Sequence, residues 1–181
     1  MKKAFRPIWG QETIDLNKRN LASLKLRRCI DSIHTEKGKA VEIGCGAGKF
    51  IRSLNLYLPS LECYAGDIDV DAINLAKSYG DGVSYSVFNA ESLPYEDNFF
   101  DIVIMFDIIE HVESTEKLLN EVMRISKRGS TIHIFIPCEK EPLTIHWLLW
   151  KLRLGHDLKK KHAGHIQRFT KKEFINKLKE K

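Results

Sequence analysis

A short apolar run followed by three glycines constrains the fold of this chain more than any other stretch. Residues 41–50 read VEIGCGAGKF, with a glycine at every second position from 44 to 48. Glycine removes the side chain where a backbone must turn sharply or approach another group closely, and a wholly apolar run is typical of a buried parallel strand. The pattern therefore predicts a strand, a tight loop and a helix, with a ligand lying against the loop.

Apolar, strand-like runs alternate with helical segments along the chain. The expected strands cover residues 40–43, 61–65, 83–88, 102–106 and 131–136, and the expected helices cover 12–34, 49–58, 71–79, 115–127 and 170–180. Strands that are apolar along their whole length and separated by helices indicate a parallel sheet covered on both faces. The sequence thus predicts a doubly wound, three-layer α/β fold.

Length and cysteine content narrow the class of protein. At 181 residues and 20.9 kDa the chain has the size of one domain, and no apolar run approaches the roughly 18 residues that cross a bilayer. The N-terminus lacks the apolar core of a signal peptide, so we expect a cytoplasmic protein. The four cysteines are widely spaced and form no metal-ligand pattern, which predicts free thiols and no metal site.

The charge is unevenly distributed. Residues 151–181 contain 11 Lys/Arg and 3 Asp/Glu, a local charge of +8, whereas residues 1–150 carry 18 and 21, a charge of −3. Such a tail is either a solvated helix face or a surface for nucleic acid or an anionic membrane. No RNA-binding signature with interleaved aromatic residues accompanies it, so nucleic acid is the less favoured partner.

The glycine loop does not fit two common nucleotide-binding patterns. A phosphate-binding P-loop needs Ser or Thr after Gly-Lys, but Gly48-Lys49 is followed by Phe50, and the third glycine of a dinucleotide-binding loop would fall at Lys49. Asp67 stands 23 positions after the first glycine, at the end of the second apolar run. A carboxylate there accepts hydrogen bonds from ribose hydroxyls. These residues favour an adenosine-bearing ligand without a pyrophosphate.

Four stretches together resemble the successive motifs of the class I S-adenosylmethionine-dependent methyltransferases, especially those that act on small molecules. They are VEIGCGAGKF, AGDIDVDAINLA, NAESLPYEDNFFDIVIMFDIIEHV and TIHIFIP, which lie within residues 38–138. The resemblance implies a Rossmann-like, mainly parallel sheet in the order 3-2-1-4-5, S-adenosylmethionine as the cofactor, and methyl transfer to a small-molecule acceptor.

The resemblance also implies roles for individual positions. Glu42 would orient the methionine end of the cofactor, Asp67 would bind the ribose, and Asn89 stands where relatives commonly carry Asp. The implied cofactor-binding residues are Glu42, Gly44, Cys45, Gly46, Gly48, Asp67, Ile68, Asn89, Ala90, Glu91, Phe106 and Asp107. Cys45 is expected to contribute its backbone and not a nucleophilic thiol.

No catalytic residue follows from the family alone, because a general base is needed only for a protonated acceptor. His111 and His165 are weak candidates for that base. The sequence is also compatible with two other functions. The chain could be a non-catalytic, S-adenosylmethionine-binding regulatory module, or an RNA methyltransferase that uses its basic tail.

We expect one methyltransferase domain with four parts. They are an N-terminal helical cap (1–37), a cofactor-binding core (38–138), a lid or substrate cap (139–169) and a C-terminal helix (170–181). Apolar and basic residues in 145–161 would close over an apolar or anionic substrate, or contact a membrane surface peripherally. Relatives add two further strands, one of them antiparallel, so we expect a truncated chain, a partner or homodimer that covers the open sheet edge, or a lid that lies across this edge.

Overall fold

The computed structural model describes residues 10–138 and 166–180. Most of the predicted lid, including His165 and residues 145–161, lies outside the described residues. The predicted cofactor-binding core and the C-terminal helix lie inside them. The structure therefore tests the fold and the position of the candidate site.

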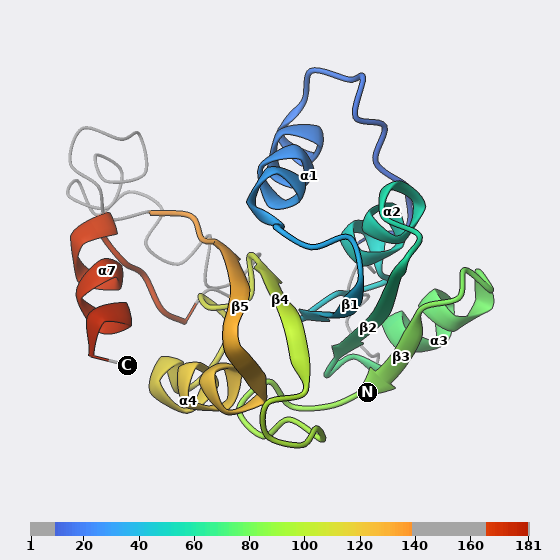
Figure 1. Ribbon diagram of the computed structural model, residues 1–181. Coiled ribbons are helices and arrows are strands. Elements are labelled where there is room, and N and C mark those ends of the chain that lie inside the picture. The colour runs from blue at the N-terminus through green and yellow to red at the C-terminus, as the bar shows by residue number, and fades with distance from the viewer. Residues whose placement is uncertain (1–9, 139–165, 181) are drawn as a thin grey trace, which may run out of the picture.

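The described residues form one parallel sheet with five strands, and its order is β3-β2-β1-β4-β5, as predicted (Figure 1). The strands are β1 (Gly38–Ile43), β2 (Leu61–Asp67), β3 (Ser84–Val87), β4 (Phe100–Phe106) and β5 (Ser126–Phe135). The order reverses between β1 and β4, because β2 and β3 extend the sheet to one side of β1 while β4 and β5 extend it to the other. In open α/β sheets this reversal opens a crevice at the carboxyl ends of the strands.

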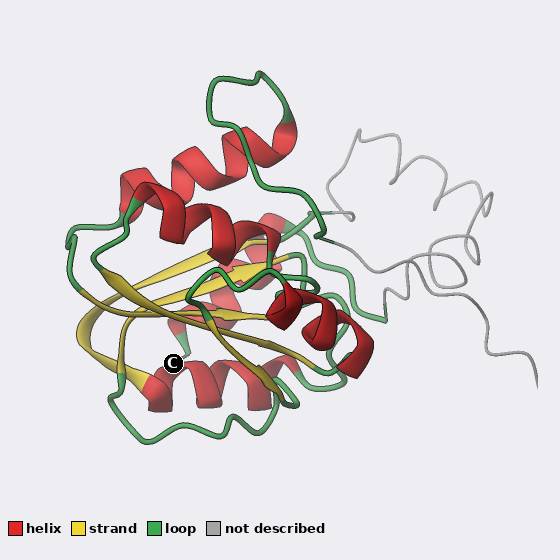
Figure 2. Ribbon diagram, turned by 90° about the vertical axis from the view of Figure 1, so that its right-hand side faces the viewer, coloured by secondary structure: helices red, strands yellow, loops and turns green. Residues whose placement is uncertain are grey.

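Helices cover both faces of the sheet (Figure 2). They are α1 (Leu21–Ser32), α2 (Lys49–Tyr57), α3 (Val70–Ser78), α4 (Thr115–Ile125) and α7 (Lys171–Lys179). Neighbouring residues of β1 point to opposite faces, because Ala40 packs with residues of α1, α2 and α3 while Val41 packs with residues of α4 and α7. The doubly wound, three-layer prediction is therefore confirmed.

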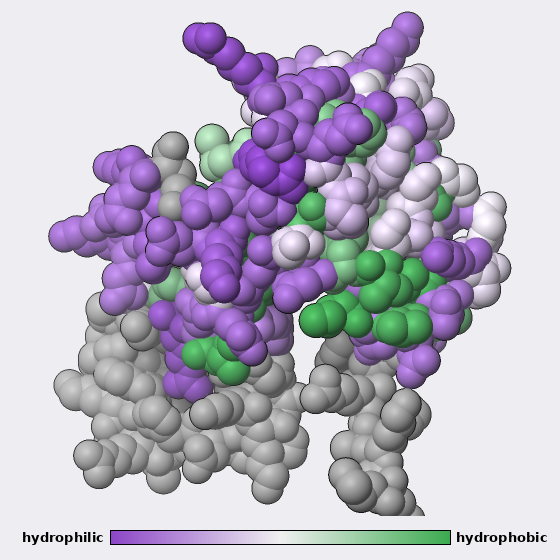
Figure 3. Space-filling view, turned by 90° about the horizontal axis from the view of Figure 1, so that it is seen from below, coloured by the Kyte–Doolittle hydropathy of each residue, from purple (hydrophilic) through white to green (hydrophobic). Residues whose placement is uncertain are grey.

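Apolar side chains are concentrated inside the two helix layers. Central residues such as Ile43, Ile102 and Met105 are fully or almost fully buried. On the face shown in Figure 3, hydrophilic side chains dominate the described surface and apolar side chains gather in separate patches. Within the described part of the chain, no helix has both the length and the hydropathy that crossing a bilayer requires.

The N-terminal helix is shorter than predicted. It begins at Leu21, after Asn20, whose side chain accepts a hydrogen bond from the Ser23 N–H and caps the helix. The preceding segment lies along α2, where the Ile14 N–H donates to Ser53 Oγ at 2.8 Å. The predicted helix over 12–34 was therefore wrong for residues 12–20, because side chains of Asn20 and α2 take the hydrogen bonds that a longer helix would use.

The boundary between α4 and β5 also differs from the prediction. The helix ends at Ile125 and the strand begins at once with Ser126, although the apolar pattern favoured a helix through 127 and a strand from 131. Phe100 pairs with Ser126 and Ile102 pairs with Thr131, so β5 carries a bulge opposite β4. Gly129 lies in this bulge with φ +81°, a conformation that favours glycine.

The C-terminal helix matches its prediction closely. Thr170 Oγ accepts from the Glu173 N–H and the Glu173 carboxylate accepts from the Thr170 N–H, which forms a capping box ahead of Lys171. Phe174 is buried against the α4 side of the sheet. The helix is thus fixed both by its cap and by one apolar anchor.

Candidate functional site

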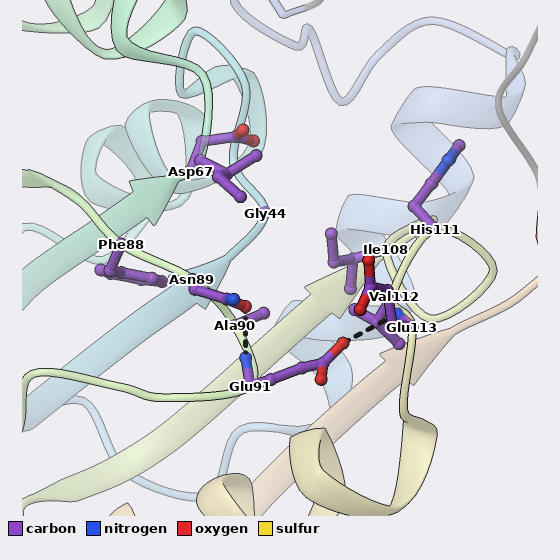
Figure 4. Close-up of a pocket in the computed structure, with 11 residues that line it drawn as sticks. Gly44, Asp67, Phe88, Asn89, Ala90, Glu91, Ile108, His111, Val112 and Glu113 are labelled. Atoms are coloured by element: carbon purple, nitrogen blue, oxygen red, sulfur yellow. Dashed lines mark hydrogen bonds between the residues drawn. The ribbon is translucent and has the colours of Figure 1, made fainter.

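A cavity of about 270 Å³ opens at the carboxyl ends of the strands, on the side where the strand order reverses (Figure 4). Its walls come from the loops that follow β1, β2, β3 and β4. The lining residues are Gly44, Asp67, Ile68, Phe88, Asn89, Ala90, Glu91, Ile108, His111, Val112 and Glu113. Six of the predicted cofactor-binding residues are among them, namely Gly44, Asp67, Ile68, Asn89, Ala90 and Glu91.

The glycine loop is fastened to the end of β2 by backbone hydrogen bonds. The N–H groups of Gly44 and Cys45 both donate to the Gly66 carbonyl, at 2.8 and 3.1 Å. Asp67 adds its side chain, because one carboxylate oxygen accepts from the Gly46 N–H at 2.8 Å and the other accepts from the Asp69 N–H at 3.0 Å. Asp67 therefore shapes the loop and also lines the cavity.

Glu42 lies next to this loop but does not line the cavity. Its side chain is almost fully buried, and its carboxyl group accepts a hydrogen bond from the Ile51 N–H in the first turn of α2 at 2.8 Å. Burial is the largest cause that raises the pKa of Glu42, to about 8, and the Ile51 bond opposes it. In this structure Glu42 joins the end of β1 to the first turn of α2. Its predicted contact with the cofactor stays a prediction.

The opposite wall of the cavity is built on Asn89 and Glu91. The Asn89 side-chain oxygen accepts from the Glu91 N–H at 2.9 Å, and Glu91 accepts from the N–H groups of Glu113 and Ser114 at 2.7 and 2.9 Å. Figure 4 draws the Asn89–Glu91 and Glu91–Glu113 bonds. Glu91 therefore holds the loop after β4 against the loop after β3, a role that the sequence did not indicate.

Some predicted cofactor-binding residues lie outside the cavity lining. The Phe106 ring stacks on Phe50 with centroids 4.0 Å apart, and Asp107 forms an ion pair with Lys25 of α1. Gly46 and Gly48 belong to the loop but do not border the cavity. The Cys45 side chain is buried, and burial raises the pKa of its thiol, which agrees with the expectation that it is no nucleophile.

His111 is the histidine that borders the cavity, and it follows β4 in the loop that also carries Ile108. Its imidazole is turned away from Asn89 and Glu91 in Figure 4. A third histidine, His133, lies in β5, where its Nδ1 is 3.2 Å from Ser32 Oγ of α1. A base assignment to His111 stays a prediction, and His165 lies outside the described residues.

Four lining residues were not predicted, namely Phe88, Ile108, Val112 and Glu113. Three of them flank His111 in the loop after β4. A loop that follows a strand of a parallel sheet lies at the carboxyl edge of the sheet, so its place after the predicted strand 102–106 is the signal that could have found them. Ile108 packs on Gly44 so closely that a Cβ there would lie 2.7 Å from its side chain.

The cavity is acidic. Among the described residues, its lining includes the carboxylates of Asp67, Glu91 and Glu113 and no Lys or Arg. An electronegative lining favours a cationic or hydrogen-bond-donating ligand and disfavours a polyphosphate. Within residues 10–138 and 166–180, no group of three or more His, Cys, Asp or Glu side chains is placed to hold a metal ion.

Comparisons with known proteins agree with this geometry. An uncharacterised protein of Methanocaldococcus jannaschii is 28% identical over 128 residues, which are 71% of this chain and 55% of that protein. Norajmaline N-methyltransferase of Rauvolfia serpentina is 29% identical over 119 residues, 62% of this chain and 40% of the relative. The chain thus spans about half or less of the length of these relatives.

The crystal structure of the YcgJ protein from Bacillus subtilis has the same fold, with a TM-score of 0.70 over 86% of this chain and 66% of that one, at 20% identity. A family profile described as a methyltransferase domain matches residues 41–134, which include all five strands except the first half of β1 and the last residue of β5. The family and the fold together imply S-adenosylmethionine as the methyl donor. The chain belongs to the class I S-adenosylmethionine-dependent methyltransferases.

Proposed function

We propose that this chain forms a methyltransferase that transfers a methyl group from S-adenosylmethionine to a small-molecule acceptor. The observation that carries the proposal is the cavity beside the glycine loop, at the reversal of strand order, with the Asp67 carboxylate in its wall. The resemblance of the sequence and the match of the family profile to residues 41–134 support it independently.

The residues present fit the adenosine part of the cofactor. Each Asp67 oxygen accepts one backbone hydrogen bond and keeps capacity for a second, as two ribose hydroxyls would require. Ile68 is 71% exposed beside Asp67, so an apolar surface is available for an adenine ring. Asn89 keeps an acceptor site on its amide oxygen in addition to the bond from Glu91.

When bound, S-adenosylmethionine supplies an electrophilic methyl group on a sulfonium centre. The task of the chain is then to hold donor and acceptor in line and to exclude water, because positioning is the main source of acceleration for such a displacement. Carboxylates in and beside the cavity favour a cationic ligand there. His111 would take a proton only from an acceptor that carries one.

Two observations support a small acceptor. Polyanionic nucleic acid binds to Lys and Arg side chains, and none of the described residues that line the cavity is a Lys or an Arg. The relative named norajmaline N-methyltransferase is similar over 62% of this chain. Residues 151–165 of the basic tail, on which an RNA acceptor would depend, lie outside the described residues.

The direct test is turnover. The chain is incubated with isotopically labelled S-adenosylmethionine and a panel of amines, phenols and carboxylic acids, and mass spectrometry follows both the labelled product and S-adenosylhomocysteine. The proposal expects label in a small molecule. Cofactor binding without turnover on any acceptor would indicate a regulatory module, and label found only in RNA would indicate the other alternative.

A further inference from the structure

A segment near the C-terminus contacts the wall of the cavity. Residues 166–170 precede α7 and run beside the loop that follows β4 (Figure 1). The N–H groups of Ile166 and Gln167 both donate to the Glu110 carbonyl, at 2.9 and 3.1 Å. The C-terminal segment is therefore joined to the loop that carries Ile108 and His111.

The side chain of Gln167 makes three more hydrogen bonds to this part of the chain. Its amide nitrogen donates to the carbonyls of Val112 and Glu113 at 2.8 and 3.1 Å, and its amide oxygen accepts from the Thr115 hydroxyl at 2.6 Å. A side-chain amide supplies two N–H donors and an acceptor oxygen at once. A side chain without these groups at position 167 would remove the hydrogen bonds to the Val112 and Glu113 carbonyls and to the buried Thr115 hydroxyl.

Glu91 holds the same loop from the other side. Its carboxylate accepts from the N–H groups of Glu113 and Ser114, whereas Gln167 donates to the carbonyls of Val112 and Glu113. In the loop after β4, backbone N–H groups are thus bonded to Glu91, and backbone carbonyl groups are bonded to Gln167. A connecting loop without such bonds would sample many conformations.

We propose that Gln167 is a positioning residue for the cofactor-binding cavity, so that cofactor affinity depends on the side-chain hydrogen bonds that Gln167 makes to the loop after β4 and to Thr115. Gln167 does not line the cavity, and it acts through Val112 and Glu113, which do. This inference rests on the proposed function, since it takes S-adenosylmethionine as the ligand. If the cavity wall is already ordered in the free protein, binding does not have to order it, and the affinity for the ligand is higher.

The first experiment compares Gln167→Met with Thr170→Ala by calorimetric titration with S-adenosylhomocysteine. Met has a similar length but makes none of the three side-chain bonds. Thr170→Ala removes the capping box of α7 and loosens the same C-terminal segment without touching the loop. We expect Gln167→Met to weaken binding roughly five- to tenfold, the loss of about one net hydrogen bond or slightly more, and Thr170→Ala to stay within about twofold.

Hydrogen exchange adds a readout that needs no ligand. The amides of Glu113 and Ser114 should exchange faster in Gln167→Met than in the unsubstituted chain, and they should not do so in Thr170→Ala. Wild-type affinity in Gln167→Met, or an equal loss in Thr170→Ala, would overturn the proposal. Failure of the unsubstituted chain to bind the ligand at all would instead overturn the proposed function.

A second variant keeps the proposal testable if Gln167→Met does not fold. Gln167→Glu retains the acceptor for Thr115, but when ionised it presents only oxygens to the carbonyls of Val112 and Glu113. A protonated carboxyl regains one donor. The affinity deficit relative to the unsubstituted chain should therefore shrink as the pH falls from about 8 to about 5, near the range where a carboxyl facing carbonyls takes up a proton. A deficit that does not change with pH would contradict the proposal.

Discussion

Lys25 of α1 and Asp107 at the end of β4 form an ion pair whose two members differ in their exposure to solvent. The Lys25 side chain is 8% exposed, whereas that of Asp107 is 41% exposed. The Lys25 ammonium also lies 4.0 Å from the centre of the Phe135 ring. The pair fastens the N-terminal helix to the carboxyl edge of the sheet, next to the candidate site.

This asymmetry predicts unequal effects of removing either charge. Asp107→Asn would leave a buried ammonium without its carboxylate and should lower the free energy of unfolding by about 2 kcal/mol, below the range for a fully buried pair because Asp107 is partly exposed. Asn tolerates the positive φ of Asp107. Lys25→Met would leave a solvated carboxylate and should cost less than about 1 kcal/mol. Urea denaturation of the two variants would contradict this if Lys25→Met were the less stable.

Substitution by alanine should lower cofactor affinity at Asp67 but mainly lower stability at Asp69. Asp67 lines the cavity and bonds Gly46, so Asp67→Ala should weaken cofactor binding by about 1 to 3 kcal/mol. Asp69 accepts from the Asp71 and Ala72 N–H groups and caps α3, so Asp69→Ala should cost about 1 kcal/mol of stability and little affinity. Calorimetry and thermal unfolding of both variants measure the two effects. Equal losses of affinity would show that the ribose contact is misplaced.

Gly48 and Gly129 form a matched pair for a test of the glycine loop. Their φ angles are +80° and +81°, so an alanine at either position is strained by roughly 1 to 2 kcal/mol. A Cβ at Gly48 would lie 2.5 Å from the Tyr85 hydroxyl, whereas a Cβ at Gly129 meets nothing within 4 Å. Gly48→Ala should therefore lose more stability than Gly129→Ala, and it alone should lose cofactor affinity. Similar unfolding free energies for the two variants would contradict the close contact with Tyr85.

The buried Glu42 predicts a specific dependence of stability on pH. Its pKa is raised from 4.5 to about 8, so between these values the folded chain binds a proton that the unfolded chain has released. Folding stability should then fall as the pH rises from about 4.5 to about 8. Glu42→Gln keeps an acceptor for the Ile51 N–H and should flatten this part of the profile, measured by denaturation at several pH values. Glu36→Gln, at an exposed position, is the control, and an equal flattening there would refute the assignment.

The parts of the fold that depend on local patterns could be predicted from the sequence. The five strands, apart from the earlier start of β5, and their order are as expected, and so are the glycine loop and the C-terminal helix. Apolar runs, glycine spacing and capping residues are short-range signals, and the family resemblance supplied the order of the strands. Asp67 was likewise placed correctly at the carboxyl end of β2, where it lines the cavity.

The contacts that were not predicted join residues far apart in the chain. Lys25 and Asp107 are 82 positions apart, and Gln167 and Val112 are 55 apart. A single sequence gives no pairing information at such separations, so Asp107 was assigned to the cofactor without its partner. The bulge at Gly129 was missed for a related reason, because glycine after a helical pattern more often ends the helix than bends a strand.

The reversal of strand order at β1 also has a kinetic consequence for folding. Val41 pairs with Tyr64, 23 positions later, on one side, but with Val103, 62 positions later, on the other. The second pairing closes the longer loop and should form later, when the half that contains β4 docks on the half that contains β2. The cavity walls come from both halves, so the ligand site is complete only after this docking. A bound ligand should therefore slow the unfolding of the chain and leave its folding rate unchanged.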